Sequence, residues 1–355
     1  MNLITIIQGN DYMKLSLYTI VCNALNYFED ILLNVDEYAR SNCKDELEFI
    51  VLDVSKESIQ IGVLSRLREI SKNWGEKIII KYYPYAKDPG IYNMRLDAIN
   101  HCTGDYIACV DGDDFFKKHA FEIMMNYLHE HPNYDIYEYS SVFVNNENDI
   151  INGNYDKQRG FDTLKLDKHF NLSVLEDKEL TKNVYLWLHI VKSSVYKLAV
   201  SKLPRLMCTY GEDVIIQFAI YVESKSFFSI QETLHVKRQF GNNDSFGKFL
   251  HRSPELVLAF NLVNAIYHII DSNENIFKHS DIKNSVRQSI IGLLRENDLN
   301  YILYDKRKFD INTKDLINKF ESVYGKGSWK FLNKLDRTRF APHERKLVDK
   351  YGLGI

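Results

Sequence analysis

The chain has 355 residues, 45% of them hydrophobic and 26% charged, which excludes a disordered, collagen-like or coiled-coil protein. Its net charge of −3 excludes a polycation that binds nucleic acid along its whole length. No apolar run reaches the ~18 residues of a membrane helix, and the beginning lacks the basic and apolar regions of a signal peptide. We therefore expect a soluble, cytoplasmic protein without a nucleic-acid partner, and the five scattered cysteines fit such a reducing compartment.

The first half of the chain alternates apolar runs of strand length with helical patterns. Strands that alternate with helices of this length indicate crossover units and a parallel sheet. Asp53 and Asp111 fall at the carboxyl ends of two of the strands, which is where open α/β sheets bind their ligands. The predicted elements, in chain order, are a strand at 15–21, a helix at 24–40, a strand at 47–54, a helix at 59–74, a strand at 77–83, a helix at 92–101, a strand at 106–114 and a helix at 116–131.

The second half has a more irregular pattern. A strand is predicted at 136–144, and a polar, loop-rich stretch follows it. From about Gly247 to the end the pattern is helical, and this part has an excess of six positive charges. The elements predicted between these two regions are a strand at 184–191, a helix from Ser193, a helix from Gly211 to about Val222, and strands at 226–230 and 233–240.

Three carboxylates, Asp111, Asp113 and Asp114, directly follow the fourth predicted strand. They repel one another, and a divalent cation would relieve that repulsion. Oxygen ligands favour Mg²⁺ or Mn²⁺, which keep open positions for phosphate oxygens. The alternative interpretation is that Asp113 or Asp114 caps the helix that follows.

Several short motifs accompany these acids in a fixed order between residues 15 and 245. Together they resemble family 2 glycosyltransferases of the GT-A fold. The resemblance implies an α/β fold with a mostly parallel, twisted sheet flanked by helices. The motifs are 20–23 (IVCN), 51–55 (VLDVS), 90–95 (GIYNMR), 104–107 (GDYI) before the acids, 192–194 (KSS), 211–214 (GEDV) and 234–238 (LHVKR).

The resemblance also implies how the chain is divided. Residues 1–246 would form the GT-A catalytic domain, with about 15–125 as the half that binds the nucleotide sugar and 126–246 as the acceptor half. Residues 247–355 lie outside the shared motifs and are expected to form a C-terminal helical extension.

For the donor, the resemblance implies a nucleotide sugar, with UDP as the expected nucleotide, bound by Asp53, Arg95 and Asp111. Asp113 would ligate Mn²⁺ or Mg²⁺ between the two phosphates, and Asp111 and His235 are further candidate ligands. Each residue also has an ordinary alternative. Asp53 can cap a turn, Arg95 can lie on a solvated helix face, and His235 can be a structural residue of its strand.

For the acceptor side, the resemblance implies that Asp213 is the general base, with Glu212 as the fallback. A hydroxyl is a weak nucleophile near neutral pH, so a carboxylate must take its proton as the new bond forms. One base opposite the leaving group implies a single displacement with inversion at the anomeric carbon. The alternative is that these acids favour the first turn of a helix because of its dipole. Lys237 and Arg238 either face a phosphate or solvate an edge strand.

By family analogy the enzyme would be a hexosyl- or N-acetylhexosaminyltransferase that acts on a bacterial surface glycan or a lipid-linked saccharide. The basic C-terminal region suggests peripheral contact with the inner face of the membrane or an oligomer contact, with solvated helix faces as the alternative. A non-catalytic relative stays open because Cys22 and Leu96 replace the usual tyrosine and asparagine. A nucleotidyltransferase would need a glycine-rich basic loop after the first strand, and residues 21–26 contain neither glycine nor a basic residue.

Overall fold

The structure is a computed structural model of the chain. The predicted helical region 247–355 and the boundary near residue 246 lie outside the residues that it describes, and so does Gly211. No helix in the described part is long and apolar enough to cross a membrane. The described residues are 12–151, 153, 155–161, 168–169, 185–205 and 212–239.

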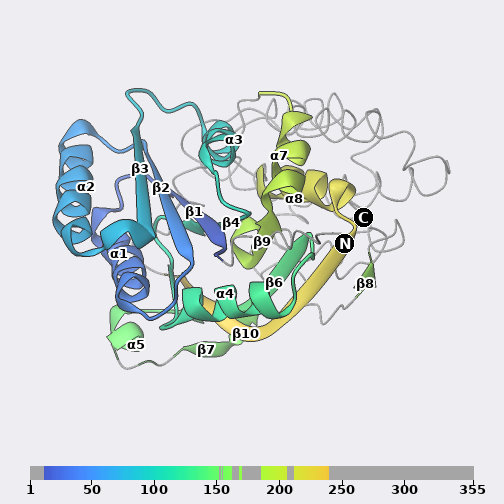
Figure 1. Cartoon of the computed structure of the whole chain (residues 1–355). Coiled ribbons are helices and arrows are strands. Elements are labelled where there is room, and N and C mark those ends of the chain that lie inside the picture. The colour runs from blue at the N-terminus through green and yellow to red at the C-terminus, as the bar shows by residue number, and fades with distance from the viewer. Residues whose placement is uncertain are drawn as a thin grey trace, which may run out of the picture.

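Ten strands of the described part form one sheet, whose main path runs β3-β2-β1-β4-β9-β6-β10-β5 (Figure 1). β7 pairs with β6, and β8 pairs with β10, off this path. The strands are β1 (Lys14–Val21), β2 (Glu46–Asp53), β3 (Ile78–Pro84), β4 (Tyr106–Asp111), β5 (Phe115–Phe116), β6 (Ile136–Val144), β7 (Asp156–Phe161), β8 (Lys168–His169), β9 (His189–Lys192) and β10 (Ser226–Arg238).

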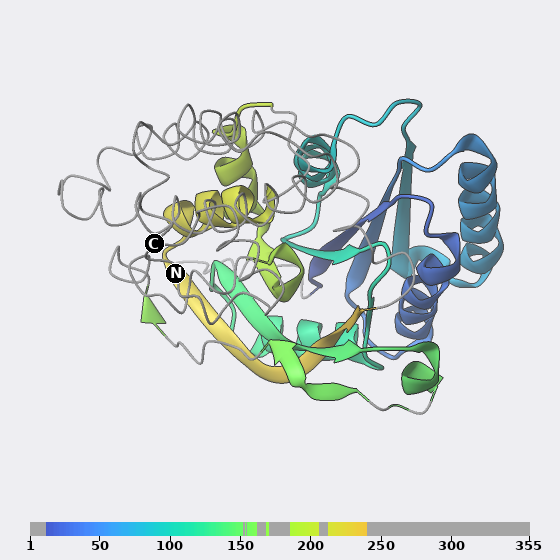
Figure 2. The same cartoon turned by 180° about the vertical axis from the view of Figure 1, so that it is seen from behind.

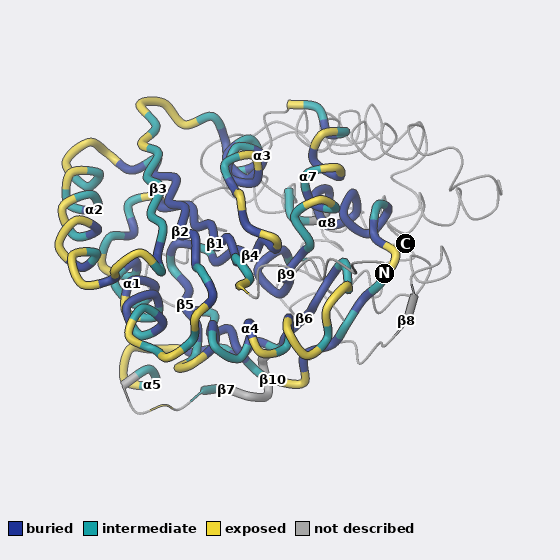
Figure 3. The backbone as a smooth tube through the Cα atoms, viewed as in Figure 1, coloured by how far each residue is buried: buried dark blue, intermediate teal, exposed yellow. Residues whose placement is uncertain are grey.

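Helices cover both faces of the sheet, which explains why its strands read as continuous apolar runs. Helices α1 and α2 lie on one side of the central strands, and α3, α7 and α8 lie on the other (Figure 2). Buried side chains of α1, α2 and α4 form one core cluster, and those of α3, α7 and α8 form the other. Figure 3 shows the central strands buried and the outer turns of α2 exposed. The helices are α1 (Leu25–Arg40), α2 (Glu57–Ile70), α3 (Ile91–His101), α4 (Ala120–Glu130), α5 (Glu147–Ile151), α7 (Ser193–Ser201) and α8 (Glu212–Glu223).

The first four long strands are parallel, as the alternating pattern predicts. β1 pairs in parallel with β2 and with β4, and β2 pairs in parallel with β3. The register places Val21 opposite Asp53 and Ile20 opposite Asp111. The two strand-end acids therefore flank the carboxyl end of β1, at one edge of the sheet.

The rest of the sheet is mixed. β9 runs antiparallel to both of its neighbours, β4 and β6, while β6 and β10 are parallel. The prediction of an α/β fold with a mostly parallel, twisted sheet flanked by helices is confirmed, with antiparallel strands added beyond β4.

Three predicted elements differ in detail. The helix predicted from 116 begins at Ala120, because β5 pairs with β10 instead. The strand predicted at 184–191 starts as the 3₁₀ turn Leu186–Leu188 and becomes β9 only at His189. The two strands predicted over 226–240 are one strand, β10, whose register with β6 shifts between Ser229 and His235.

One buried carboxylate stabilises the amino-terminal end of the parallel strands. Glu48 is fully buried and accepts hydrogen bonds from Ser16 Oγ (2.5 Å), Lys81 Nζ (2.7 Å), and the backbone N (2.7 Å) and Oγ1 (2.6 Å) of Thr103. Burial alone would raise the pKa of Glu48, but the hydrogen bonds from Lys81, Ser16 and Thr103 lower it to about 2. This carboxylate is therefore ionised in the folded protein at every pH above about 2.

We expect Glu48→Gln to lower the free energy of unfolding at pH 7 by about 3 kcal/mol, because folding lowers the pKa of this carboxyl from 4.5 to about 2 and thereby stabilises the folded state by that much. The wild type should lose the same contribution as the pH falls from about 4.5 towards 2. Urea unfolding followed by circular dichroism at several pH values measures both effects. The matched control is Glu46→Gln, whose side chain is 47% exposed. A destabilisation by Glu48→Gln that stayed constant down to pH 2 would contradict the expectation.

Candidate active site

Two of the sequence motifs meet at the carboxyl end of β1. Asn23 has a left-handed backbone (φ 55°), and its N–H donates to Ser55 Oγ at 2.8 Å. The backbone N–H of Lys56 donates in return to Asn23 Oδ1 at 3.1 Å. Motifs 20–23 and 51–55 therefore form one connected loop pair beside the strand ends.

Asp53, the predicted contact of the nucleotide base, lies in this loop pair. Its side chain is fully buried, and Oδ1 accepts a hydrogen bond from the N–H of Ser55 at 2.8 Å. Oδ2 accepts a second one from the Tyr82 hydroxyl at 3.0 Å. This is the geometry of the turn-capping alternative, and both carboxylate oxygens are engaged within the protein.

The acids after β4 form a tight turn, in which the N–H of Asp114 donates to the carbonyl oxygen of Asp111 at 3.0 Å. A Cβ atom at Gly112 would lie only 2.4 Å from the carbonyl oxygen of Ile20. Only glycine allows the turn to approach the backbone of β1 so closely. We call residues 111–114 the acid turn.

The end of β10 holds the acid turn in place. The backbone N–H of Arg238 donates to Asp114 Oδ1 at 2.9 Å, and its guanidinium donates to the carbonyl oxygen of Asp113 at 2.6 Å. The same guanidinium also pairs with Asp30 of α1. Asp114 is fully buried and is therefore part of the frame of the turn.

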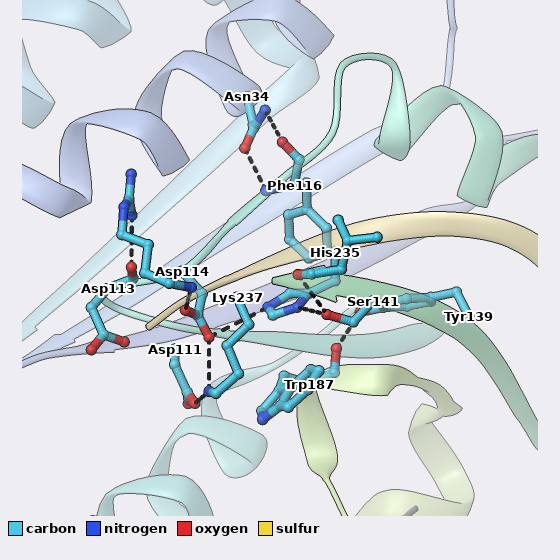
Figure 4. A network of polar contacts seen from close by, with 12 residues as sticks. Asn34, Asp111, Asp113, Asp114, Phe116, Tyr139, Ser141, Trp187, His235 and Lys237 are labelled. Carbon is cyan, nitrogen blue, oxygen red and sulfur yellow. Dashed lines mark hydrogen bonds and ion pairs between the residues drawn. The ribbon is translucent and has the colours of Figure 1, made fainter. Parts of the chain in front are cut away.

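His235, a further metal ligand predicted from the sequence, is fully buried beside this turn (Figure 4). Its Nδ1 is 3.0 Å from Ser141 Oγ, and its ring stacks on Trp187 with 4.5 Å between the centroids. Burial lowers the pKa of His235 well below its usual range, so the imidazole is neutral. Its Nε2 is 3.6 Å from Asp114 Oδ2 and has no hydrogen-bond partner among the described residues, while the stacking on Trp187 is what the structural alternative expects.

Asp113 differs from its two neighbours. Its side chain is half-buried, its own backbone N–H donates to its carboxylate, and it makes no ion pair within 4 Å with any described residue. Burial and the nearby charge of Asp111 raise the pKa of this carboxyl. Within the described residues no three His, Cys, Asp or Glu side chains gather into a complete metal site. Asp113 could hold a cation, because a cation would neutralise a crowded carboxylate that Lys237 and Arg238 attract only from a distance.

Arg95 of α3 connects the acid turn with Asp213, the predicted general base. The helix begins after Gly90, which has a left-handed backbone (φ 85°), and the guanidinium is almost completely buried. Its Nη2 donates to Asp111 Oδ1 at 3.0 Å, while Nε lies 3.3 Å from Asp213 Oδ1 and 3.5 Å from Glu212 Oε1. The structure therefore brings Arg95, Asp111, Glu212 and Asp213 together, although they come from three separate elements.

Asp213 and Glu212 stand in the first turn of α8, with side chains 19% and 12% exposed. Burial raises the pKa of Asp213 to about 8, although the charge of Arg95 acts in the opposite direction. Burial also raises the pKa of Glu212. A carboxyl that titrates near the working pH is suited to exchange a proton with a substrate hydroxyl.

Lys237 lies beside the acid turn, near the end of β10. Its Nζ is 3.2 Å from Asp114 Oδ2, 3.9 Å from Asp111 Oδ2 and 4.8 Å from the ring centre of Trp187. Burial lowers the pKa of this ammonium, but the attraction of Asp114 and Asp111 outweighs that effect and keeps it charged.

Comparison with known proteins identifies the domain that carries these acids. Residues 16–175 match the family model of glycosyl transferase family 2. The chain carries a glycosyl transferase family 2 domain. The predicted recognition and enzyme class are confirmed, and the match includes Asp53, Arg95 and the acid turn. No match was found among curated proteins.

Solved structures support the fold of this glycosyltransferase. A crystal structure of TarS from S. aureus in complex with UDP-GlcNAc has a TM-score of 0.61 and 14% identity, and the match covers 91% of this chain and 82% of that one. A second TarS structure, in complex with UDP, has a TM-score of 0.58 and 13% identity, with 96% and 88% covered. At these identities the likeness establishes the GT-A fold of the glycosyltransferase.

The arrangement gives this glycosyltransferase two chemical capacities. The acid turn contains one half-buried carboxylate without an ion pair among the described residues, Asp113, which could bind a cation or a polar ligand. The start of α8 presents Asp213, a carboxyl with a raised pKa, on the other side of Arg95. The ion pair between Arg238 and Asp30 is not predicted from the sequence. The two residues are 208 positions apart in the chain, and no local pattern indicates that they are in contact.

Proposed function

We propose that this glycosyltransferase moves a sugar from a UDP-type nucleotide sugar to an acceptor hydroxyl, with inversion and with the help of a divalent cation. The observation that carries the proposal is that one guanidinium, Arg95, lies between Asp111 of the acid turn and Asp213 of α8. A nucleotide sugar bound at the acid turn and an alcohol bound at Asp213 would then lie next to the same guanidinium. The UDP and UDP-GlcNAc bound to TarS support a UDP donor and an N-acetylhexosaminyl or hexosyl group.

On the donor side, Asp113 would hold Mn²⁺ or Mg²⁺, with Asp111 able to contribute an oxygen. When bound, the cation supplies a Lewis acid that neutralises charge on the departing diphosphate. Arg95 keeps Asp111 in place by a charge-assisted hydrogen bond. Asp53 would touch the nucleotide base only if the ligand displaced one of its two internal hydrogen bonds. We do not include His235 among the ligands.

On the acceptor side, Asp213 would accept the proton of the attacking hydroxyl while the sugar moves to that oxygen. The pKa of about 8 gives this carboxylate much more basicity than an ordinary aspartate. Arg95 orients it through the contact at 3.3 Å. Glu212 is the fallback base, and at 3.5 Å from the same guanidinium it would help to fix the position of Arg95.

We expect kcat/KM for transfer to increase with pH and to level off above about 8. Asp213 acts as a base only when ionised, and burial raises its pKa from 3.8 to about 8, so the protonated, inactive form dominates at lower pH. Initial rates between pH 5.5 and 9.5 at low substrate concentration measure this dependence. A profile that is flat across that range would contradict the assignment of the base.

For the acceptor, we propose a hydroxyl of a bacterial surface glycan or a lipid-linked saccharide. The basic region 247–355, with its excess of six positive charges, would support contact with an anionic membrane surface from the cytoplasmic side. Sedimentation of the full chain with vesicles that contain anionic lipid, at low and high salt, tests this contact. Binding that is absent at low salt would remove it from the proposal.

The proposed function is tested by donor hydrolysis over a panel of nucleotide sugars, together with thermal unfolding in the presence of nucleotides. Selective ligand binding stabilises the folded state. We expect UDP with Mn²⁺ to raise the melting temperature and a UDP-sugar to be hydrolysed slowly. Indifference to every nucleotide would favour a non-catalytic relative instead.

A further inference from the structure

We propose that Lys237 is a built-in cation of the donor site, which binds the diphosphate of the nucleotide directly and supports nucleotide binding without a divalent metal. This inference rests on the proposed function and adds a phosphate-binding residue to its donor side. It is carried by the position of the Lys237 ammonium between two carboxylates of the acid turn, 3.2 Å from Asp114 and 3.9 Å from Asp111 (Figure 4).

Lys237 is more accessible to a ligand than the two arginines near the acid turn. Three cationic side chains pair with the acid turn or its frame in the described part of the chain, namely Arg95, Arg238 and Lys237. The side chains of Arg95 and Arg238 are only 4% and 2% exposed, whereas that of Lys237 is 24% exposed. Lys237 is therefore the cation among these three that a ligand can reach without rearrangement of the core.

The two arginines each bind several groups of the protein, whereas the Lys237 ammonium makes a single hydrogen bond with the described residues. Arg95 is shared among Asp111, Glu212 and Asp213, and Arg238 binds Asp30 and a backbone carbonyl oxygen. An ammonium has three N–H donors. That of Lys237 makes one hydrogen bond, to Asp114 Oδ2, while the Asp111 oxygen at 3.9 Å is beyond hydrogen-bond distance.

The ring of Trp187 helps to fix the position of the Lys237 ammonium. The indole of Trp187 lies 4.8 Å from Lys237 Nζ, and His235 stacks on that ring from within the core. A cation above an aromatic face is held by the ring's quadrupole and stays partly desolvated, which strengthens its attraction for an anion. The ammonium is thus fixed at the acid turn before any ligand arrives.

Lys237 offsets part of the negative charge of the acid turn. Asp111, Asp113 and Asp114 lie within four residues, and a nucleoside diphosphate would add further negative charge beside them. Lys237 compensates part of that charge permanently, whereas the carboxylate of Asp113 depends on a cation from solution. The site should therefore bind a diphosphate weakly without metal and more strongly with it.

The test measures UDP affinity of the full chain by titration calorimetry, once with Mn²⁺ and once with EDTA. We expect wild type to bind UDP in EDTA, and Lys237→Met to weaken that binding by about 10-fold or more, since a charge-assisted hydrogen bond is lost. Lys237→Gln, whose amide can still donate to Asp114, should show the same loss even if the methionine variant folds poorly. Lys237→Arg should retain most of the affinity, because it keeps the charge.

The matched control is Lys225→Met, an exposed lysine just before the other end of β10, which should leave UDP affinity unchanged. UDP affinity in EDTA that is equal in wild type and both neutral variants would overturn the inference while leaving the proposed function intact. The same holds if wild type binds UDP only with Mn²⁺. Absence of UDP binding under both conditions would overturn the proposed function itself, and the inference with it.

Discussion

Asp213→Asn is expected to lower the rate of sugar transfer by about 10³-fold while UDP affinity changes little. The amide keeps the size and position of the carboxylate next to Arg95 but cannot accept the proton of the acceptor hydroxyl. Steady-state rates with acceptor, combined with calorimetric UDP titration, separate the two effects. Glu212→Gln is the paired variant, and it should retain much more activity if Asp213 is the base.

The stability of Asp213→Asn provides an internal control. The folded state raises the pKa of Asp213 from 3.8 to about 8, so it holds the proton more tightly than the unfolded state does. The stabilising effect of that proton is complete below pH 3.8 and is lost as the pH rises through 8. The asparagine variant should therefore melt at no lower temperature than wild type at pH 8. Full transfer activity in this variant would show that another group is the base.

Asp113→Ala is expected to abolish the increase in UDP affinity that Mn²⁺ produces, an effect of at least about 100-fold on metal affinity. The carboxylate of Asp113 makes no ion pair with a described residue, so its removal should not disturb the frame that Asp114 and Arg238 form. Calorimetric titration of UDP at several Mn²⁺ concentrations measures the loss.

The control for this experiment is Glu69→Ala on the exposed surface of α2, where the side chain is 67% exposed. In EDTA, the Asp113 variant should bind UDP at least as well as wild type, since it removes a negative charge near the diphosphate. An unchanged Mn²⁺ dependence would mean that the cation is held elsewhere.

Much of the parallel half of the fold could be predicted from the sequence. The apolar runs of β1, β2 and β4 are each followed by polar turn residues, and short parallel crossovers then place those turns at one edge. The family motifs also predicted that Arg95, Asp111 and Asp213 belong to one site. The roles of these residues are proposals. Arg95 and Asp111 lie on a crossover helix and a strand of the parallel half, and Asp213 joins them from the start of α8.

The mixed half could not be predicted in the same way because its contacts join distant segments. β9 enters between β4 and β6 although about fifty residues separate it from β6 in the chain, and β5 pairs with a strand more than a hundred residues later. Local periodicity does not report such pairings. For the same reason, the sequence could not decide whether Asp53 contacts a nucleotide or caps its own turn, since Tyr82 comes from a different strand.

The guanidinium shared by Asp111 and Asp213 has a consequence for the kinetic mechanism. A divalent ion that attracts Asp111 would weaken the hold of this acid on Arg95, whose positive field would then act more strongly on Asp213 and favour its ionised form. A larger fraction of Asp213 would then be ionised once the donor and its cation are bound, so an alcohol that arrived after them would meet the base more often. Under the proposed function we therefore expect ordered turnover in which the donor binds first.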